Sequence, residues 1–172
     1  MSLYSMCIEQ NKKMLGNLVR WIDIAVSYAE QRKFEPDVLL SMRLSPDQFP
    51  LRRQLQVVAD TAKLTAARLT GQEAPKHEDD ETTLAQLKTR LMEVIAYLDT
   101  FSAADFEGAD ERLIPLAFMP GKVARGADYF EGFAVPNLYF HVTTSYALLR
   151  HAGVPLGKRD FIGHFAMQDA PT

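Results

Sequence analysis

Two polar side chains, Asn137 and His141, stand four residues apart in a segment whose other inward positions are mostly apolar. Residues 136–153 have the sequence PNLYFHVTTSYALLRHAG. Proline at the start and glycine at the end predict a single helix, and the four-residue spacing places both side chains on one face. Burying an unpaired imidazole costs free energy, so this one needs a hydrogen-bond partner, a ligand or a metal ion. His141 is therefore the main candidate for binding or general-base chemistry.

Inward polar positions predicted on other helices could complete a site around His141. They are Asn11 in the first helical segment and Gln54 and Thr61 in the second. Neutral amides and hydroxyls offer hydrogen bonds to a small molecule. An amide is a poor ligand for transition metals, and Asn137 stands where a second histidine would form a metal-binding pair. We predict binding by His141, Asn137, Gln54, Asn11 and Thr61. We assign no catalytic residue, metal ligand or cofactor. The sequence leaves open whether a divalent metal ion binds weakly.

The sequence lacks the motifs of several enzyme classes. It contains no Glu-x-x-His pair, glycine-rich phosphate loop, Gly-x-Ser-x-Gly motif or His-Glu-x-x-His motif. Ser145 follows His141 by one helical turn, but neither an orienting acid nor an oxyanion hole is indicated. Whether the protein is an enzyme is therefore left open.

The composition is that of a globular chain. The 172 residues include 47% hydrophobic and 24% charged residues, with a net charge of −3. We expect a single domain over residues 1–172. There is no basic patch for nucleic acid, and no apolar run approaches the ~20 residues of a membrane span. Cys7 is the only cysteine. With no signal peptide recognised, we expect a cytoplasmic protein.

Apolar residues at intervals of three and four predict an all-α fold. The predicted helices are residues 2–31, 50–70, 82–101 and 136–152. Their shared apolar faces favour a four-helix bundle. We expect the polar run at 72–81, including His77, to be a solvated loop. The charged residues of the third helix, Arg90 among them, fall outside its apolar face.

The helical period is lost over residues 103–135. Residues 111–118 and 127–133 have strand-like composition, and Pro120-Gly121 between them is a turn signal. We therefore predict a short β-hairpin inserted before the last main helix.

Three segments of the sequence resemble a known family. They are FAVPNLYFHVTTSYALLRHAG at 133–153, GKRDFIG at 157–163, and DQFPL at 47–51 followed by Gln54. The chain resembles an uncharacterised bacterial family, a domain of unknown function, in the DinB/YfiT-like metalloenzyme superfamily. The resemblance implies a DinB-like four-helix bundle.

The resemblance also implies a metal ion in many members, held by three histidines. One comes from the second helix, near Val57 in this sequence, and two form a His-x-x-x-His pair on the last main helix. Asn137 and His141 occupy the positions of that pair. Some relatives are transferases or isomerases that use low-molecular-weight thiols.

Three functions are consistent with these patterns. The first is a DinB-like protein that binds a small molecule around His141. In this protein the three-histidine metal site of the superfamily is degraded. The second is a metal-dependent, thiol-transferase-like enzyme in which His141, Asn137 and Gln54 hold a weak metal ion. The third is a non-catalytic scaffold or interaction protein.

Aromatic residues outside the apolar stripes predict self-association. They are Tyr4, Trp21, Tyr28 and Tyr146. An exposed apolar patch is typical of an interface, so we expect a homodimer.

Overall fold

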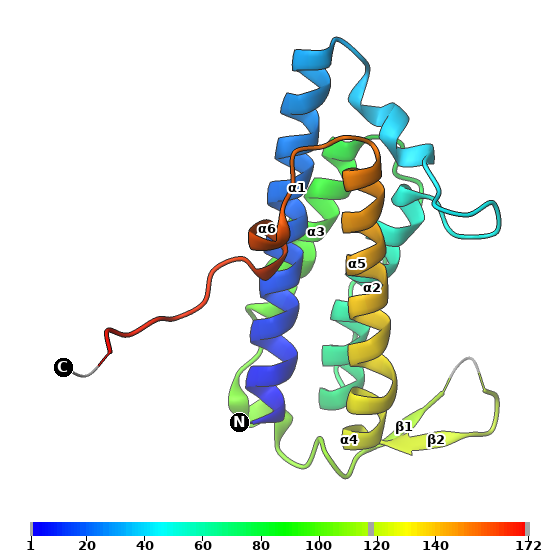
Figure 1. Ribbon diagram of the computed structural model, residues 1–172. Helices are drawn as coiled ribbons and strands as arrows, with labels where there is room; N and C mark the ends of the chain where they lie inside the picture. Colours follow the sequence, from blue (N-terminus) through cyan, green and yellow to red (C-terminus); the bar gives the residue numbers. More distant parts are fainter. Residues whose placement is uncertain (1, 117–118, 171–172) are drawn as a thin grey trace.

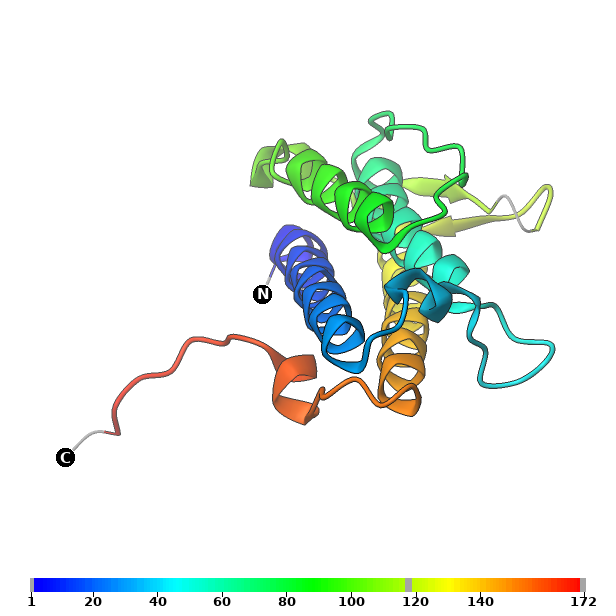
Figure 2. The same ribbon diagram turned by 90° about the horizontal axis from the view of Figure 1, so that it is seen from above.

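Long helices dominate the computed structural model, which describes residues 2–116 and 119–170 (Figure 1). The long helices are α1 (Gln10–Arg32), α2 (Leu51–Thr70), α3 (Leu84–Leu98) and α5 (Val135–His151). Viewed from above, they surround a common centre (Figure 2). Their buried leucine, valine and isoleucine side chains form one continuous core. The mostly helical fold predicted from the apolar periodicity is therefore confirmed.

Local sequence signals set the ends of these helices. Gly71 adopts a left-handed conformation, with φ of 78°, directly after α2. Thr83 caps α3 by accepting a hydrogen bond from the backbone of Gln86, whose side chain bonds back to Thr83. Pro136 lies in the first turn of α5, but the chain is already helical from Gly126, so this proline stands inside a longer helical run and removes one backbone donor there. The other helix boundaries lie within a few residues of the predicted ones.

The long helices differ in direction: α1 and α5 run one way, α2 and α3 the other (Figure 1). Ion pairs between Lys12 and Asp99 and between Asp23 and Lys88 join α1 to α3 in antiparallel fashion. Because α2 and α3 are consecutive yet parallel, the chain between them must return along the length of the molecule. Residues 71–83 make this return, and we call them the crossover.

The crossover is fixed by a buried guanidinium group. Arg90 on α3 is only 2% exposed and lies 2.7 Å from a carboxylate oxygen of Asp60 on α2. It also lies 2.6 Å from Asp79 and 2.8 Å from Glu81, both in the crossover. The prediction of a loop over residues 72–81 is right, and most of these residues are exposed. Asp79 and Glu81 are not simply solvated, because they contact a cation that the predicted helix pattern had placed outside the core.

His77 is likewise enclosed within the crossover. Its Nδ1 lies 2.6 Å from Nζ of Lys63 on α2, and its Nε2 lies 3.4 Å from a carboxylate oxygen of Glu93 on α3. Burial, followed by the positive charges of Lys63 and Arg90, lowers the pKa of His77. The ring is therefore neutral at pH 7, accepting from Lys63 and donating toward Glu93.

A short β-hairpin precedes α5 as predicted. Strands β1 (Leu113–Pro115) and β2 (Val123–Arg125) pair antiparallel, with Ile114 opposite Ala124. Ile114 is buried, so this face of the hairpin packs on the core. Residues 117 and 118 of the predicted first strand lie outside the described residues.

The second predicted strand, residues 127–133, is helical instead. It forms α4 (Gly126–Tyr129) and the π-helical segment η4 (Phe130–Ala134), which runs directly into α5. Helical geometry buries both Tyr129 and Phe130, which alternating strand positions would place on opposite faces. Gly126 permits the backbone of α4 to lie close to Ala109, because a Cβ there would lie 1.8 Å from the carbonyl oxygen of Ala109.

Shorter helical segments complete the described chain. They are the π-helical η1 (Ser5–Glu9), the 3₁₀ segments η2 (Pro36–Ser41) and η3 (Ala103–Phe106), and the helix α6 (Lys158–Ile162). Residues 163–170 extend away from the body (Figures 1 and 2). None of the helices described is long and apolar enough to cross a membrane.

The C-terminal helix α6 covers the tryptophan expected at a surface patch. Trp21 is 0% exposed, and its Nε1 donates to the carbonyl oxygen of Asp160 at 3.2 Å. Its indole stacks on Phe161 and meets the edge of Tyr146. The expectation that Trp21 is exposed was wrong, because the sequence of α6 was too short to show a helical period. The homodimer stays a prediction, without support from this residue.

Candidate functional site

Four of the five predicted binding residues form two hydrogen-bonded pairs between α2 and α5. Nδ1 of His141 lies 2.6 Å from Oε1 of Gln54. Nδ2 of Asn137 donates to Oγ1 of Thr61 at 2.8 Å. Residue numbers fall along α2 as they rise along α5, so these helices are antiparallel. We call these four residues the α2–α5 seam.

The hydrogen bonds of Gln54 fix the state of His141. The amide nitrogen of Gln54 donates to the carbonyl oxygen of Phe49 at 3.0 Å, so its Oε1 faces the imidazole and can only accept. Nδ1 of His141 must therefore carry the hydrogen. Burial, and after it the positive charge of Arg53, lowers the pKa of His141. The ring is neutral at pH 7, with the lone pair on Nε2.

His141 retains one free hydrogen-bonding atom. The residue is 7% exposed, and no hydrogen bond to its Nε2 occurs in residues 2–116 and 119–170. The adjacent ring of Phe140 meets the imidazole edge-on, with centroids 5.1 Å apart. Nε2 could accept a proton or a hydrogen bond from a molecule at the surface of the α2–α5 seam.

The seam does not fit a three-histidine metal centre. Asn137 donates its amide hydrogen to Thr61, and the α2 position near Val57 has no histidine beside it. Across the part of the chain that the structure describes, no three His, Cys, Asp or Glu side chains are placed to hold one metal ion. Only His141 supplies a side chain of the ligand type that the resemblance implies.

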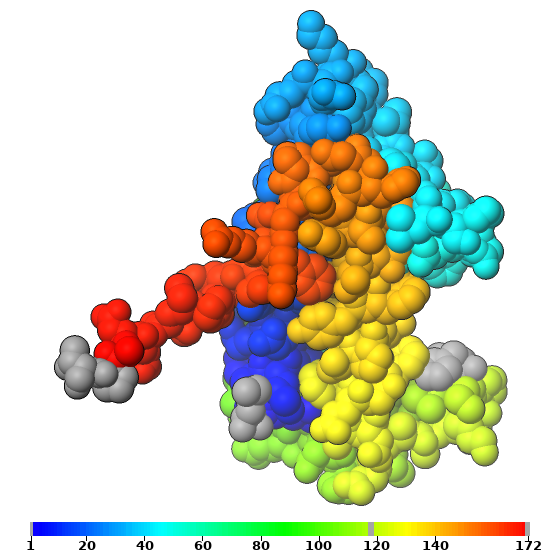
Figure 3. Space-filling view, in the orientation of Figure 1, coloured from blue at the N-terminus to red at the C-terminus, as the bar shows by residue number. Residues whose placement is uncertain are grey.

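The fifth predicted residue, Asn11, lies apart from the seam and lines a cavity of about 240 Å³. The lining residues are Met6, Gln10, Asn11, Thr65, Phe130, Ala134, Val135, Leu138 and Tyr139. The cavity lies between η1 and α1 on one side and η4 and α5 on the other. These blue and yellow segments adjoin in the space-filling view (Figure 3). Among the described lining residues there is neither His141 nor Gln54.

The cavity and the α2–α5 seam are neighbours along the helices. Thr65 in the cavity wall follows Thr61 of the seam by one turn of α2, and its Oγ1 donates to the carbonyl oxygen of Thr61 at 2.6 Å. Leu138 in the wall directly follows Asn137 of the seam. The Asn137–Thr61 hydrogen bond therefore holds together the two helices that meet at the inner end of the cavity.

Two π-helical segments contribute to the cavity wall. Met6 belongs to η1, and Phe130 and Ala134 belong to η4. A π-helical turn holds one residue more than an α-helical turn and is frequent at functional sites. Phe130 and Tyr139 were not predicted as site residues. The helical period of apolar residues is lost before α5, which distinguishes this segment from the regular helices. That loss favoured the prediction of a strand there.

Cys7 lies beside the cavity residue Asn11, whose Nδ2 donates to its Sγ at 3.6 Å. Burial raises the pKa of the Cys7 thiol to about 12. The thiol is therefore neutral at pH 7 and a poor nucleophile. It adds no charge to this part of the molecule.

Comparisons with known proteins support the resemblance to an uncharacterised, DinB-like family. The family model for DUF1993, a domain of unknown function, matches residues 3–162. The crystal structure of a DinB family member protein from Shewanella denitrificans at 1.83 Å resolution is similar, with a TM-score of 0.94 and 47% sequence identity. The match covers 98% of this chain and 96% of that chain. No curated protein sequence matches. The chain therefore belongs to the DUF1993 family and is similar to a DinB family member.

Proposed function

We propose that this DUF1993 protein binds a small molecule in the cavity between η1 and η4, within a DinB-like four-helix bundle. The observation that carries the proposal is the cavity itself, about 240 Å³ in volume. The cavity is partly open at the surface, so a ligand can enter it. An apolar cavity of ~150 Å³ holds benzene. By that measure this cavity has room for about ten non-hydrogen atoms.

The predicted binding residues take two different roles in this proposal. Asn11 contacts the ligand, because it lines the cavity. The α2–α5 seam holds the helices that form the cavity's inner end, since its side chains bond to one another. We therefore propose that the ligand lies beside Asn11 rather than around His141, the position expected from the sequence.

A cavity-filling substitution tests the proposal. Ala134, in η4, is buried and lines the cavity, so Ala134→Leu places three extra carbon atoms in the void. The matched control is Ala85→Leu, at an exposed position of α3. Thermal denaturation is measured for each protein with a panel of ring compounds of up to about ten non-hydrogen atoms.

Compounds that bind the folded protein raise its melting temperature, since saturation at one hundred times Kd stabilises it by about 2.7 kcal/mol. We expect such compounds to stabilise the wild type and Ala85→Leu, but not Ala134→Leu. Leu138→Phe, a second filling variant, replaces Ala134→Leu if the latter does not fold. Compounds that stabilise the filled variants as strongly as the wild type would overturn the proposal, as would a panel without any stabilising compound.

A further inference from the structure

The amide of Asn11 has an unused hydrogen-bonding atom at the cavity. The residue is 4% exposed. Its Nδ2 donates to Sγ of Cys7, a weak acceptor, at 3.6 Å. No donor within the described residues reaches its Oδ1. The only buried side-chain nitrogen or oxygen without a partner among the described residues is Nε of Arg90, so Oδ1 of Asn11 is reached by solvent. A ligand that donates to Oδ1 would take the place of water there.

The rest of the cavity wall carries no charge. Its described lining residues include no Asp, Glu, Lys, Arg or His. Besides Asn11, the polar ones are Gln10, Thr65 and Tyr139. Because Oγ1 of Thr65 already donates its hydrogen to the carbonyl oxygen of Thr61, it can only accept from a ligand. A charged ligand would lose its hydration here without meeting an opposite charge.

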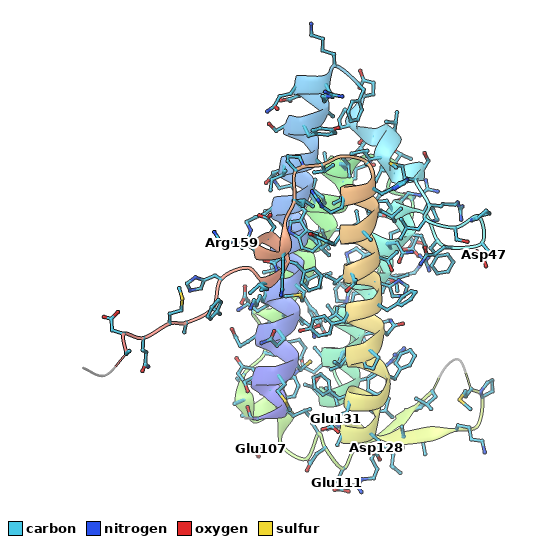
Figure 4. All side chains as sticks on the ribbon, in the orientation of Figure 1. Asp47, Glu107, Glu111, Asp128, Glu131 and Arg159 are labelled. Carbon is cyan, nitrogen blue, oxygen red and sulfur yellow. The ribbon has the colours of Figure 1, made fainter. Side chains whose placement is uncertain are left out.

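Carboxylates surround the end of the molecule where η4 lies. Glu107, Glu111, Asp128 and Glu131 all lie at this end (Figure 4). Glu131 belongs to η4 itself and is exposed, and Glu111 forms an ion pair with Arg125. The exposed carboxylate of Glu131, in the segment that lines the cavity, disfavours the approach of an anionic ligand.

We infer that the cavity takes an uncharged ring compound with one hydroxyl group, which donates its hydrogen to Oδ1 of Asn11. The apolar remainder of the ligand packs against Leu138, Phe130 and Met6. This inference rests on the proposed function and adds the chemical class of the ligand to it.

Four matched probes test the inference by calorimetric titration of the wild-type protein. They are 4-ethylphenol, ethylbenzene without the hydroxyl, 4-ethylanisole with the oxygen but not its hydrogen, and the anion 4-ethylbenzoate. We expect 4-ethylphenol to bind about tenfold more tightly than ethylbenzene or 4-ethylanisole, which is the usual effect of one hydrogen bond. Binding of 4-ethylbenzoate should be weakest.

The variant Asn11→Leu removes the acceptor and keeps the branching and the number of non-hydrogen atoms of the side chain. We expect it to bind 4-ethylphenol no more tightly than ethylbenzene. If this variant does not fold, the comparison of 4-ethylphenol with 4-ethylanisole on the wild type gives the same answer.

The outcomes separate the inference from the proposed function. Equal affinities of the wild type for 4-ethylphenol and ethylbenzene, with both lost in Ala134→Leu, overturn the hydroxyl specificity and leave cavity binding intact. Tightest binding of 4-ethylbenzoate overturns the uncharged class. Failure of all four probes to bind the wild type overturns both the inference and the cavity as a site for ring compounds.

Discussion

The imidazole of His141 on α5 donates its Nδ1 hydrogen to Oε1 of Gln54 on α2, across a distance of 2.6 Å. Gln54 is 0% exposed, so neither group can exchange its partner for bulk water. The pair therefore ties two antiparallel helices together at one fixed register. Its effect on stability depends on both side chains being present.

Substitutions at this pair are expected to be non-additive. His141→Leu and Gln54→Leu should each reduce the free energy of unfolding by about 1–3 kcal/mol, because each leaves a buried polar partner unpaired. The double variant should lose less than the sum of the two, since it leaves no unpaired group of the pair. Urea denaturation of the four proteins measures the coupling. Strict additivity would show that the hydrogen bond is not formed in solution.

Removing Arg90 should release the crossover. Arg90→Met leaves Asp60, Asp79 and Glu81 without their shared cation, and loss of one member of a buried ion pair costs about 3–5 kcal/mol. The control Lys88→Met breaks the exposed ion pair with Asp23 on the same helix and should cost about 0–1 kcal/mol.

Urea denaturation gives the stability of these variants, and limited proteolysis reports on the crossover. We expect cleavage within residues 71–83 to be faster in Arg90→Met than in Lys88→Met. Similar stabilities and cleavage rates in the two variants would contradict the role of Arg90.

Stability should fall as the pH drops below about 6.5, the ordinary pKa of histidine. Burial lowers the pKa of both His77 and His141 in the folded protein. The unfolded chain therefore binds protons first, and the free energy of unfolding decreases until the pH falls below the folded-state pKa values. At lower pH, protonation of Asp79 and Glu81 continues the loss, because the folded state lowers the pKa of both.

Denaturation with urea at a series of pH values checks this dependence. His77→Gln removes one titrating group but keeps an oxygen that can accept from Lys63. This variant should show a shallower fall in stability between pH 7 and pH 5 than the wild type. A stability that is constant over this range in the wild type would be evidence against neutral, buried imidazoles.

The single tryptophan reports on the docking of α6. Phe161 stacks on Trp21 with ring centroids 5.8 Å apart and is partly buried. Phe161→Ala should cost about 2 kcal/mol, roughly half the cost for a fully buried phenylalanine. It should also shift the fluorescence of Trp21 to longer wavelength as water reaches the indole. Phe165→Ala, at a 54% exposed position, is the matched control and should change neither quantity.

The helices could be predicted because their core positions repeat at a fixed spacing. In α3, for example, Leu84, Leu87 and Leu91 are all buried, as the apolar period indicates. The inward polar residues of α2 and α5 could also be identified, since they interrupt such stripes. Which of them pair could not be predicted, because the pairing of Gln54 with His141 depends on the register between two helices.

The cavity and the crossover could not be predicted from spacing alone. Arg90 lies off the apolar stripe of α3, and its burial depends on carboxylates from α2 and the crossover. Phe130 and Ala134 are four residues apart and lie on the same wall, within a π-helical segment. The aromatic residues there favoured a strand, because strand and buried helix are hard to distinguish over short apolar runs.

The two π-helical segments mark places where the helices around Asn11 can change length by one residue. Each residue of an α-helix turns the chain by about 100°, whereas a π-helical segment accommodates one extra residue in its wider hydrogen-bonding pattern. Deleting one residue from η4 would therefore restore α-helical winding and leave α4 and the hairpin close to their present orientation relative to α5. Deleting one residue from the α-helical part of α5 would instead rotate every residue before it by about 100° and turn Phe130 out of the cavity wall.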